Sequence, residues 1–265
     1  MPDLILLFKA VLLGLVEGLT EFLPVSSTGH LILFGHALKF EGPSASVFDV
    51  VIQVGAIVAV LWVYRARFWN VAVSLKEPRS QKFVGVLLLA FLPAAALGLL
   101  FHHVIKTYLF NPQVVAISLI VGGVVMLVID RLRLAVTIND VDHMGWLTAL
   151  KIGLFQCAAM VPGVSRSGAT IIGGMFSGLD RKTAAEFSFF LAVPTLTAAA
   201  LYDLYKNWTG LSSSDLVLMS VGFVSSFVFG MLAIAVFIRL IVRVGFTPFA
   251  IYRILLGAII LFFAR

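Results

Sequence analysis

Residues 17–30 are EGLTEFLPVSSTGH, a run rich in polar side chains within an otherwise apolar sequence. Two apolar segments overlap this run. Residues 4–23 carry Lys9, Glu17 and Glu21 and end at Pro24, and residues 26–38 are too short to cross a bilayer, which takes about 20 residues. Polar backbone at membrane depth is tolerated only where it is buried in protein or lines a wet cavity. The sequence therefore predicts a re-entrant helical hairpin over residues 4–38, with residues 17–30 as its polar first elbow.

The composition places this hairpin in a membrane protein. Hydrophobic residues make up 61% of the 265 residues and charged residues 12%, whereas soluble domains are about a quarter charged. This excludes soluble enzymes, secreted disulfide scaffolds and disordered chains, and the single cysteine allows no internal disulfide. The net charge of +6 indicates basic cytoplasmic loops rather than a nucleic-acid partner. We expect no cleavable signal peptide, because the start of the sequence lacks a basic region.

Six apolar stretches are predicted to cross the membrane in full, with a second hairpin between the third and the fourth. The spans are residues 48–64, 84–101, 112–129, 187–202, 216–238 and 248–263. The second hairpin covers residues 147–177, and its second elbow, residues 162–170, is PGVSRSGAT. Arg253 stands near the start of the last span, where anchoring at the cytoplasmic interface explains it as well as a functional role does.

The two hairpins match each other when the chain is shifted, without a gap, so that Ser26 falls on Ser165 and Gly29 on Gly168. Apolar sequences can align by chance, but the ungapped match of the elbows favours a duplication, with repeats at residues 1–133 and 134–265. Each repeat holds one re-entrant helical hairpin plus three transmembrane helices, and because three is odd the second repeat is inverted. The predicted fold class is an all-α polytopic membrane protein, one integral membrane domain of two inverted-topology repeats.

The charges of two loops orient the chain in the membrane. Residues 65–82 carry five basic residues and one acidic residue, whereas the equivalent residues 203–215 carry one Lys and two Asp. Because basic loops stay in the cytoplasm, the first loop is predicted inside and the second outside. Both termini are then extracytoplasmic.

The first elbow places two carboxylates on one face of a helix. Glu17 and Glu21 are four residues apart, and such a pair in an apolar helix persists by sharing a proton, facing a cation or binding a hard metal. The alternative is a buried polar contact that only locks helices together, but ionisable groups inside a membrane are functional as a rule. The same elbow also holds Ser26, Ser27 and His30.

The second elbow predicts an anion site. Arg166 stands among three hydroxyl residues at the start of a helix, where free backbone N–H groups and a guanidinium suit phosphate. These hydroxyl residues are Ser165, Ser167 and Thr170. The alternative is an arginine that reaches a lipid headgroup, but Arg166 lies in the middle of its hairpin rather than at the end of a span.

The register between the hairpins shows that their elbows differ in chemistry. Glu17 corresponds to Gln156, Glu21 to Met160, Ser27 to Arg166 and His30 to Ala169. One elbow is therefore acidic with a histidine, and the other is basic and rich in hydroxyls. Inverted repeats bring such elbows together near the midplane. Asp49 and Gln53, at the start of the next span, are candidates to line the joint site, whose side chains suit metal-assisted phosphoryl chemistry on an amphiphile.

Four motifs resemble those of the bacterial undecaprenyl-diphosphatase family, also called bacitracin-resistance proteins. They are the two elbows, EFSF with AVP at residues 186–189 and 192–194, and PFAIYR at residues 248–253. The similarity covers essentially the whole chain. It implies a protein of the bacterial plasma membrane that hydrolyses undecaprenyl diphosphate to undecaprenyl phosphate. This returns the lipid carrier to peptidoglycan and cell-wall synthesis and confers bacitracin resistance. Its partners would be that lipid and the bilayer, with no nucleic acid and with a homodimer left open.

The resemblance also implies roles for the residues of the elbows. Glu17 and Glu21 would hold a divalent cation, Mg²⁺ or Ca²⁺, against the diphosphate. Phosphate oxygens would be bound by Arg166 together with the hydroxyls of Ser26, Ser165, Ser167 and Thr170. Ser27 or a water is the nucleophile, and His30 acts as general base or protonates the leaving group.

A flippase or transporter of polyprenyl phosphate is the alternative function, because inverted repeats with broken helices are typical of transporters. A flippase needs an anion site but neither a carboxylate pair nor a nucleophile, so the sequence favours the hydrolase. The site is predicted to open to the extracytoplasmic side, since the family's role implies that wall polymerases release the diphosphate on the outer leaflet.

Overall fold

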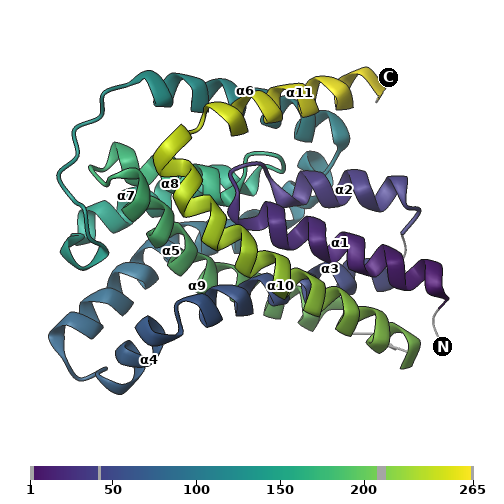
Figure 1. Ribbon diagram of the computed structural model, residues 1–265, viewed down its shortest axis with the longest axis horizontal. Coiled ribbons are helices and arrows are strands. Elements are labelled where there is room, and N and C mark those ends of the chain that lie inside the picture. The colour runs from purple at the N-terminus through teal and green to yellow at the C-terminus, as the bar shows by residue number, and fades with distance from the viewer. Residues whose placement is uncertain (1–2, 41–42, 208–212, 264–265) are drawn as a thin grey trace.

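The structure, a computed structural model, describes residues 3–40, 43–207 and 213–263. These residues are helical almost throughout, and no β-strand occurs among them apart from one isolated bridge between Ile138 and Leu179. The prediction of an all-α protein is confirmed. The α-helices are α1 Leu4–Phe22, α2 Ser27–Ala37, α3 Pro43–Val63, α4 Arg65–Val73, α5 Pro78–Val104, α6 Pro112–Arg131, α7 Trp146–Cys157, α8 Arg166–Phe176, α9 Arg181–Asn207, α10 Ser213–Val244 and α11 Thr247–Phe263 (Figure 1).

Within the described ranges, five helices are long and apolar enough to cross a membrane, which confirms a polytopic membrane protein. They are α3, α5, α6, α9 and α10, and α9 is the most buried of them. The stretch predicted as a sixth span forms α11, which is 17 residues long and thus shorter than the other five. It runs beside α6 along the upper edge of the molecule in Figure 1.

Helices α1 and α2, and likewise α7 and α8, pack as pairs where the hairpins were predicted, and the two pairs share an uncommon backbone at equivalent positions. That the hairpins are re-entrant in a membrane stays a prediction. Ser26 has φ 71° and Ser165 has φ 76°, a left-handed conformation that non-glycine residues rarely adopt. Each of these serines caps the helix that follows it, accepting a hydrogen bond from the backbone N–H of Gly29 and Gly168 respectively. Helices α2 and α8 then each run for 11 residues. The duplication remains a prediction, and these paired features support it.

Close contacts between helix backbones hold the hairpins against the long spans. Helix α1 packs along α10, where a Cβ added to Gly14 would lie 2.3 Å from the carbonyl oxygen of Gly222. In the same way, a Cβ on Gly153 of α7 would lie 2.5 Å from the carbonyl oxygen of Ala90 in α5. Small residues allow such an approach where lipid gives no hydrophobic drive for helices to associate. The glycines therefore set how deep each hairpin sits.

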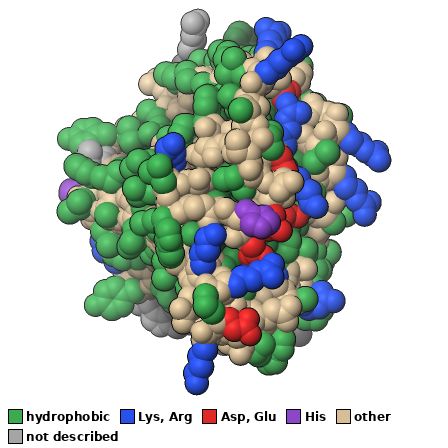
Figure 2. Space-filling view, turned by 90° about the vertical axis from the view of Figure 1, so that its left-hand side faces the viewer, with side chains coloured by type: hydrophobic (Ala, Val, Ile, Leu, Met, Phe, Trp, Pro, Cys, Tyr) green, Lys and Arg blue, Asp and Glu red, His purple; other side chains and the backbone are tan. Residues whose placement is uncertain are grey.

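A cluster of charges closes the end of the molecule that carries α4. Asp142, in the turn before α7, accepts hydrogen bonds from Arg67 and Arg79, and its backbone carbonyl accepts one from Lys82. The hydrogen bonds from Arg67, the largest of several causes, lower the pKa of Asp142 to about 2. At the same end, Arg181 of α9 pairs with Asp130 of α6. Figure 2, which looks at this end, shows Lys and Arg side chains gathered with acidic side chains between them.

We predict that Gly14→Ala destabilises the protein by about 2 kcal/mol, because the added methyl group meets a backbone carbonyl that cannot yield without moving α10. Thermal unfolding in detergent measures the change. Gly98→Ala is the matched control, since a Cβ there has nothing within 4 Å, and it should leave stability unchanged or slightly raised. Equal unfolding temperatures for the two variants would contradict the close contact.

Candidate active site

A cavity of about 1300 Å³ lies between the two hairpins and helices α3, α5 and α9. Most of its wall is apolar, but charged and polar side chains gather where the elbows meet. Both residues expected to line the site, Asp49 and Gln53, do line it. The polar lining includes Glu17, Glu21, Ser26, Ser27, Asp49, Gln53, Gln156, Ser165, Arg166, Thr195 and Asp203. The cavity thus combines a polar end with a long apolar wall, as an amphiphile requires.

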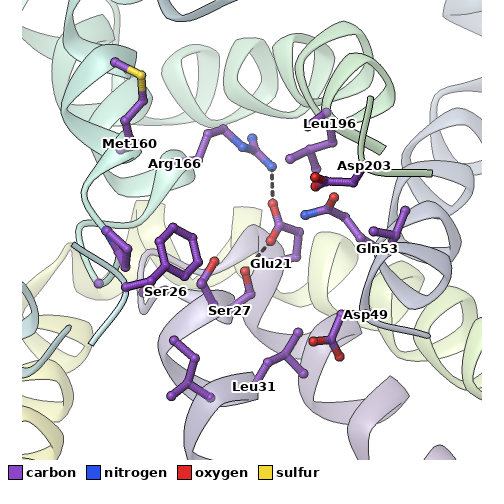
Figure 3. Close-up of a pocket in the computed structure, with 18 of the residues that line it drawn as sticks. Glu21, Ser26, Ser27, Leu31, Asp49, Gln53, Met160, Arg166, Leu196 and Asp203 are labelled. Carbon is purple, nitrogen blue, oxygen red and sulfur yellow. Dashed lines mark hydrogen bonds and ion pairs between the residues drawn. The ribbon is translucent and has the colours of Figure 1, made fainter. Parts of the chain in front are cut away.

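One carboxylate joins the two elbows at the centre of this polar end. Glu21 accepts a hydrogen bond from the hydroxyl of Ser27 through Oε2, and its Oε1 lies 2.8 Å from Nη2 of Arg166. Figure 3 shows Glu21 between these two side chains. Arg166 is held from behind, because its Nη1 donates to the backbone carbonyl of Ser188 over 2.9 Å. Side chains 145 positions apart in the sequence are therefore in direct contact within a buried site.

Several buried polar atoms around this contact have no hydrogen-bond partner among the described residues. Both carboxylate oxygens of Glu17 are in this state, although the residue is only 1% exposed. The others that line the cavity are Nε2 of Gln156 and Nε of Arg166. Leaving a buried polar group unpaired costs about 1–3 kcal/mol, and more for a charged group, so each calls for an explanation. In this cavity the unpaired atoms comprise two acceptors and two donors.

The side chains of the cavity show whether the expected divalent cation could be bound there. In the part of the chain that is described, no group of three or more His, Cys, Asp or Glu side chains could hold a metal ion. Mg²⁺, however, is commonly held by one or two carboxylates together with substrate phosphates. The free carboxylate of Glu17 fits such a ligand, while Glu21 is already shared between Arg166 and Ser27. The residues present therefore fit a cation that is completed by its substrate.

His30 lies behind the elbow serines, outside the lining that the described residues form. Its Nδ1 is 2.7 Å from the carbonyl oxygen of Ser26, which can only accept, so this nitrogen carries a hydrogen. Its Nε2 is 2.6 Å from the hydroxyl of Tyr252, and the two rings stack. Sequence reasoning gave Tyr252 no role, although it belongs to the PFAIYR motif. In this structure His30 holds the backbone of Ser26, next to Ser27, against Tyr252.

The hydroxyls of the second elbow are bonded mainly to the protein. Ser167 donates to the backbone carbonyl of Leu23 over 2.9 Å and so links the second elbow to the first. Thr170 bonds to the hydroxyl of Ser188 and to the carbonyl of Arg166. Of the three hydroxyl residues around Arg166, the cavity lining includes Ser165. Phosphate binding by Ser167 and Thr170 stays a prediction, and in this structure their bonds position Arg166 and the elbows.

Arg253 is the residue whose place the sequence left most open. It is fully buried, with 0% of its surface exposed, so anchoring at the membrane interface was wrong. Its guanidinium donates to backbone carbonyls of both elbows, namely those of Pro24, Gly163 and Val164, over 2.8–3.0 Å. It also donates to the carbonyls of Ser118 and Leu119 in α6. Position near a helix start does not reveal depth, because depth depends on how the last helix packs beside α6.

Two hairpins whose elbows meet in a buried charged cavity, within a bundle of long apolar helices, define an integral membrane protein with a site for a charged, amphiphilic ligand. Comparison with known proteins is more specific. The chain belongs to the family described as bacitracin resistance protein BacA, whose sequence model matches residues 10–259.

Relatives with similar sequences match over nearly their whole length. Undecaprenyl-diphosphatase 2 of Rhodospirillum rubrum is 56% identical over 98% of this chain and 95% of its own. Undecaprenyl-diphosphatase of Aromatoleum aromaticum is 54% identical over 98% of this chain and 95% of its own. The protein of that name from Nitrosomonas eutropha is 55% identical, with 99% and 96% covered.

We predict that Arg253→Lys lowers stability by about 2 kcal/mol or more, because an ammonium offers only three donors in place of five contacts and lacks the planar fork that reaches carbonyls of both elbows at once. Thermal unfolding of the purified protein measures this loss. Arg243→Lys, at an exposed position near the end of α10, is the charge-matched control and should unfold like the unaltered chain. If Arg253→Lys unfolds at the same temperature as this control, the five carbonyl contacts do not hold the elbows.

Proposed function

We propose that this chain hydrolyses undecaprenyl diphosphate to undecaprenyl phosphate and inorganic phosphate, and that this recycles a lipid carrier for cell-wall synthesis. The observation that carries the proposal is the contact of Ser27, Glu21 and Arg166 at the polar end of a large apolar cavity. The names of the relatives, which match over nearly the whole chain, support the substrate. Removal of the lipid form that bacitracin sequesters accounts for the resistance in the family's description.

The cavity suits the two ends of such a lipid. Its polar end offers a guanidinium, an amide and hydroxyls to the diphosphate, and carboxylates to a counter-cation. The wall beyond it is built from residues such as Leu31, Phe91 and Leu196, which can take the first isoprene units. A C55 tail extends further than the cavity, so it enters laterally between spans and its remainder stays in the bilayer.

The geometry supports Ser27 as the nucleophile and Glu21 as its base. The Ser27 hydroxyl already donates to Glu21, so this carboxylate takes the proton as Oγ attacks the terminal phosphorus. The bond from that phosphorus to the bridging oxygen breaks, and the bridging oxygen leaves as part of undecaprenyl phosphate. Water then hydrolyses the phosphoserine, which gives inorganic phosphate and restores the Ser27 hydroxyl. The alternative is direct attack by water on the diphosphate. Ser27→Ala distinguishes the two routes, because it abolishes turnover only if the reaction passes through phosphoserine.

Charge that develops on the phosphate oxygens is stabilised from the second elbow. Arg166 has an unpaired Nε and lies at the start of α8, where backbone N–H groups also face an anion. A divalent cation held by Glu17, with Glu21 beside it, would neutralise diphosphate oxygens and make the terminal phosphorus easier to attack. His30 and Tyr252 hold the Ser26 carbonyl and thereby fix the position of Ser27.

The alternative, a flippase, is not favoured. It would use the anion site and the apolar wall but would have no use for a serine hydroxyl bonded to a buried carboxylate. The site instead joins a serine hydroxyl and a guanidinium through the carboxylate of Glu21, which supports a transferase or hydrolase of phosphoryl groups.

The position of the cavity supports an extracytoplasmic opening in the bacterial plasma membrane. The cavity is lined by residues 45–53 of α3, residues 91–99 of α5 and residues 195–203 of α9. Each of these is the half of its helix that lies away from the basic cluster around Asp142. If that cluster is cytoplasmic, as the loop charges predict, the cavity occupies the outer half of the protein. A homodimer stays a prediction.

We predict that Glu21→Gln lowers the rate of phosphate release at least about a hundredfold, because the amide keeps the shape of the site but cannot accept the Ser27 proton. The assay uses purified protein in lipid vesicles with a polyprenyl diphosphate and Mg²⁺, and a chelator should stop the unaltered enzyme. Glu77→Gln, on the exposed turn before α5, is the control and should retain full activity. Normal turnover by Glu21→Gln would remove Glu21 from the chemistry. Translocation of the headgroup without phosphate release by the unaltered protein would establish a transporter instead.

The side of opening is checked with single cysteines in a Cys157→Ala background. A cysteine at Ala198, in the cavity wall of α9, should react in intact spheroplasts with a membrane-impermeant thiol reagent, and a diphosphate competitor should slow the reaction. A cysteine at Lys76, in the exposed turn after α4, should react only in inverted vesicles. The reverse pattern of labelling would place the opening in the cytoplasm.

A further inference from the structure

Gln156 carries a polar group whose burial nothing in the fold accounts for. The residue lies near the end of α7, before the second elbow, and is 2% exposed. Its Oε1 accepts a hydrogen bond from the hydroxyl of Thr195 over 3.3 Å, whereas its Nε2 has no partner among the residues described. With Oε1 turned toward Thr195, both N–H groups of Nε2 are free. A buried amide donor without an acceptor is costly, so it is expected to serve a ligand.

The free nitrogen belongs to a side chain that lines the same cavity as Arg166. Arg166 uses Nη1 for the Ser188 carbonyl and Nη2 for Glu21, and its Nε is likewise unpaired. The second hairpin therefore contributes two buried, unpaired donors to the cavity. The first hairpin contributes two unpaired acceptors, the carboxylate oxygens of Glu17. The N–H donors of the second hairpin suit an anion such as phosphate, and the carboxylate oxygens of the first suit a cation bound to that anion.

The alignment of the two hairpins shows the same difference between donors and acceptors at one pair of equivalent positions. Gln156 precedes Ser165 by the same number of residues as Glu17 precedes Ser26. Glutamine and glutamate have nearly the same shape, so the two equivalent positions differ in charge and in the presence of N–H donors. A carboxylate at position 156 would repel a phosphate bound by Arg166, and an amide attracts it. Of the two equivalent residues, Glu17 thus suits the metal ion of a metal–diphosphate, and Gln156 suits its phosphate oxygens.

We propose that Gln156 is a phosphate-binding residue, whose carboxamide N–H groups donate to a non-bridging oxygen of the diphosphate beside Arg166. This inference rests on the proposed function and deepens it, because it assigns the recognition of the phosphate oxygens to an uncharged donor as well as to a cation. Thr195 is then a positioning residue that orients the amide with its nitrogen toward the ligand.

The test compares Gln156→Met and Gln156→Glu with the unaltered enzyme. Methionine keeps the length of the side chain and removes both donors, so kcat/KM for a polyprenyl diphosphate should fall roughly ten- to a hundredfold. Inorganic pyrophosphate, used as a competitor, should inhibit Gln156→Met more weakly by a similar factor. Gln156→Glu should lose more, since it places a negative charge beside the phosphate. Cys157→Ala, the neighbouring position outside the cavity lining, is the control and should behave like the unaltered enzyme.

Stability separates a binding role from a structural one. Because Gln156→Met removes the unpaired Nε2 together with one long hydrogen bond, from Thr195 over 3.3 Å, its unfolding temperature should stay about the same. Unchanged kcat/KM and unchanged inhibition by pyrophosphate would overturn the proposal, and so would a fall in unfolding temperature with unchanged inhibition. If the unaltered protein released no phosphate, the proposed function would fail. In that case, weaker binding of pyrophosphate by Gln156→Met would still uphold Gln156 as an anion ligand.

Discussion

The buried guanidinium of Arg253 is the interaction on which the rest of the site depends. A chain that turns inside a membrane leaves carbonyl groups without helical partners, and lipid cannot supply donors to them. Arg253 supplies several donors from one residue, and the carbonyls it binds come from both elbows and from α6. It therefore fixes the two elbows relative to each other as well as stabilising each. The positions of the elbow residues that line the cavity depend on that arrangement.

The ion pair of Glu21 and Arg166 links the two elbows and also contacts Ser27 through Glu21. Two buried charges stabilise a protein only when each is well paired, and here each group is also bonded to the elbow or span behind it. Under the proposed function, a diphosphate that enters the cavity would compete with Glu21 for Arg166. Glu21 would keep its bond to the Ser27 hydroxyl while Arg166 turns toward the phosphate. One carboxylate would thereby couple substrate binding to the proposed activation of Ser27.

The sequence predicts the parts of this site that are costly in an apolar environment. Glu17, Glu21, Arg166 and the elbow serines stand out because a charge or an unpaired backbone needs a reason inside a membrane. That these residues lie close together was predicted from the alignment of the two hairpins, without any knowledge of how the helices pack. The partners of Arg253 and the stacking of Tyr252 on His30 could not be predicted in this way. Both depend on how α11 lies against the elbows, and a helix's own sequence does not specify its neighbour. The same limit applies to Ser167 and Thr170, whose bonds to Leu23 and Ser188 depend on which face of α8 is turned inward.

The left-handed backbone of Ser26 has a consequence for the speed of the chemistry. A residue in this region has few neighbouring conformations to visit, and here a cap to Gly29 and a bond from His30 restrict it further. Ser27 follows directly, as the first residue of α2. If Ser27 is the nucleophile, as proposed, the entropy of bringing its hydroxyl to the reacting phosphorus is lost when the protein folds, not in each catalytic cycle. The proposed nucleophile would then not need to search for its target in each catalytic cycle.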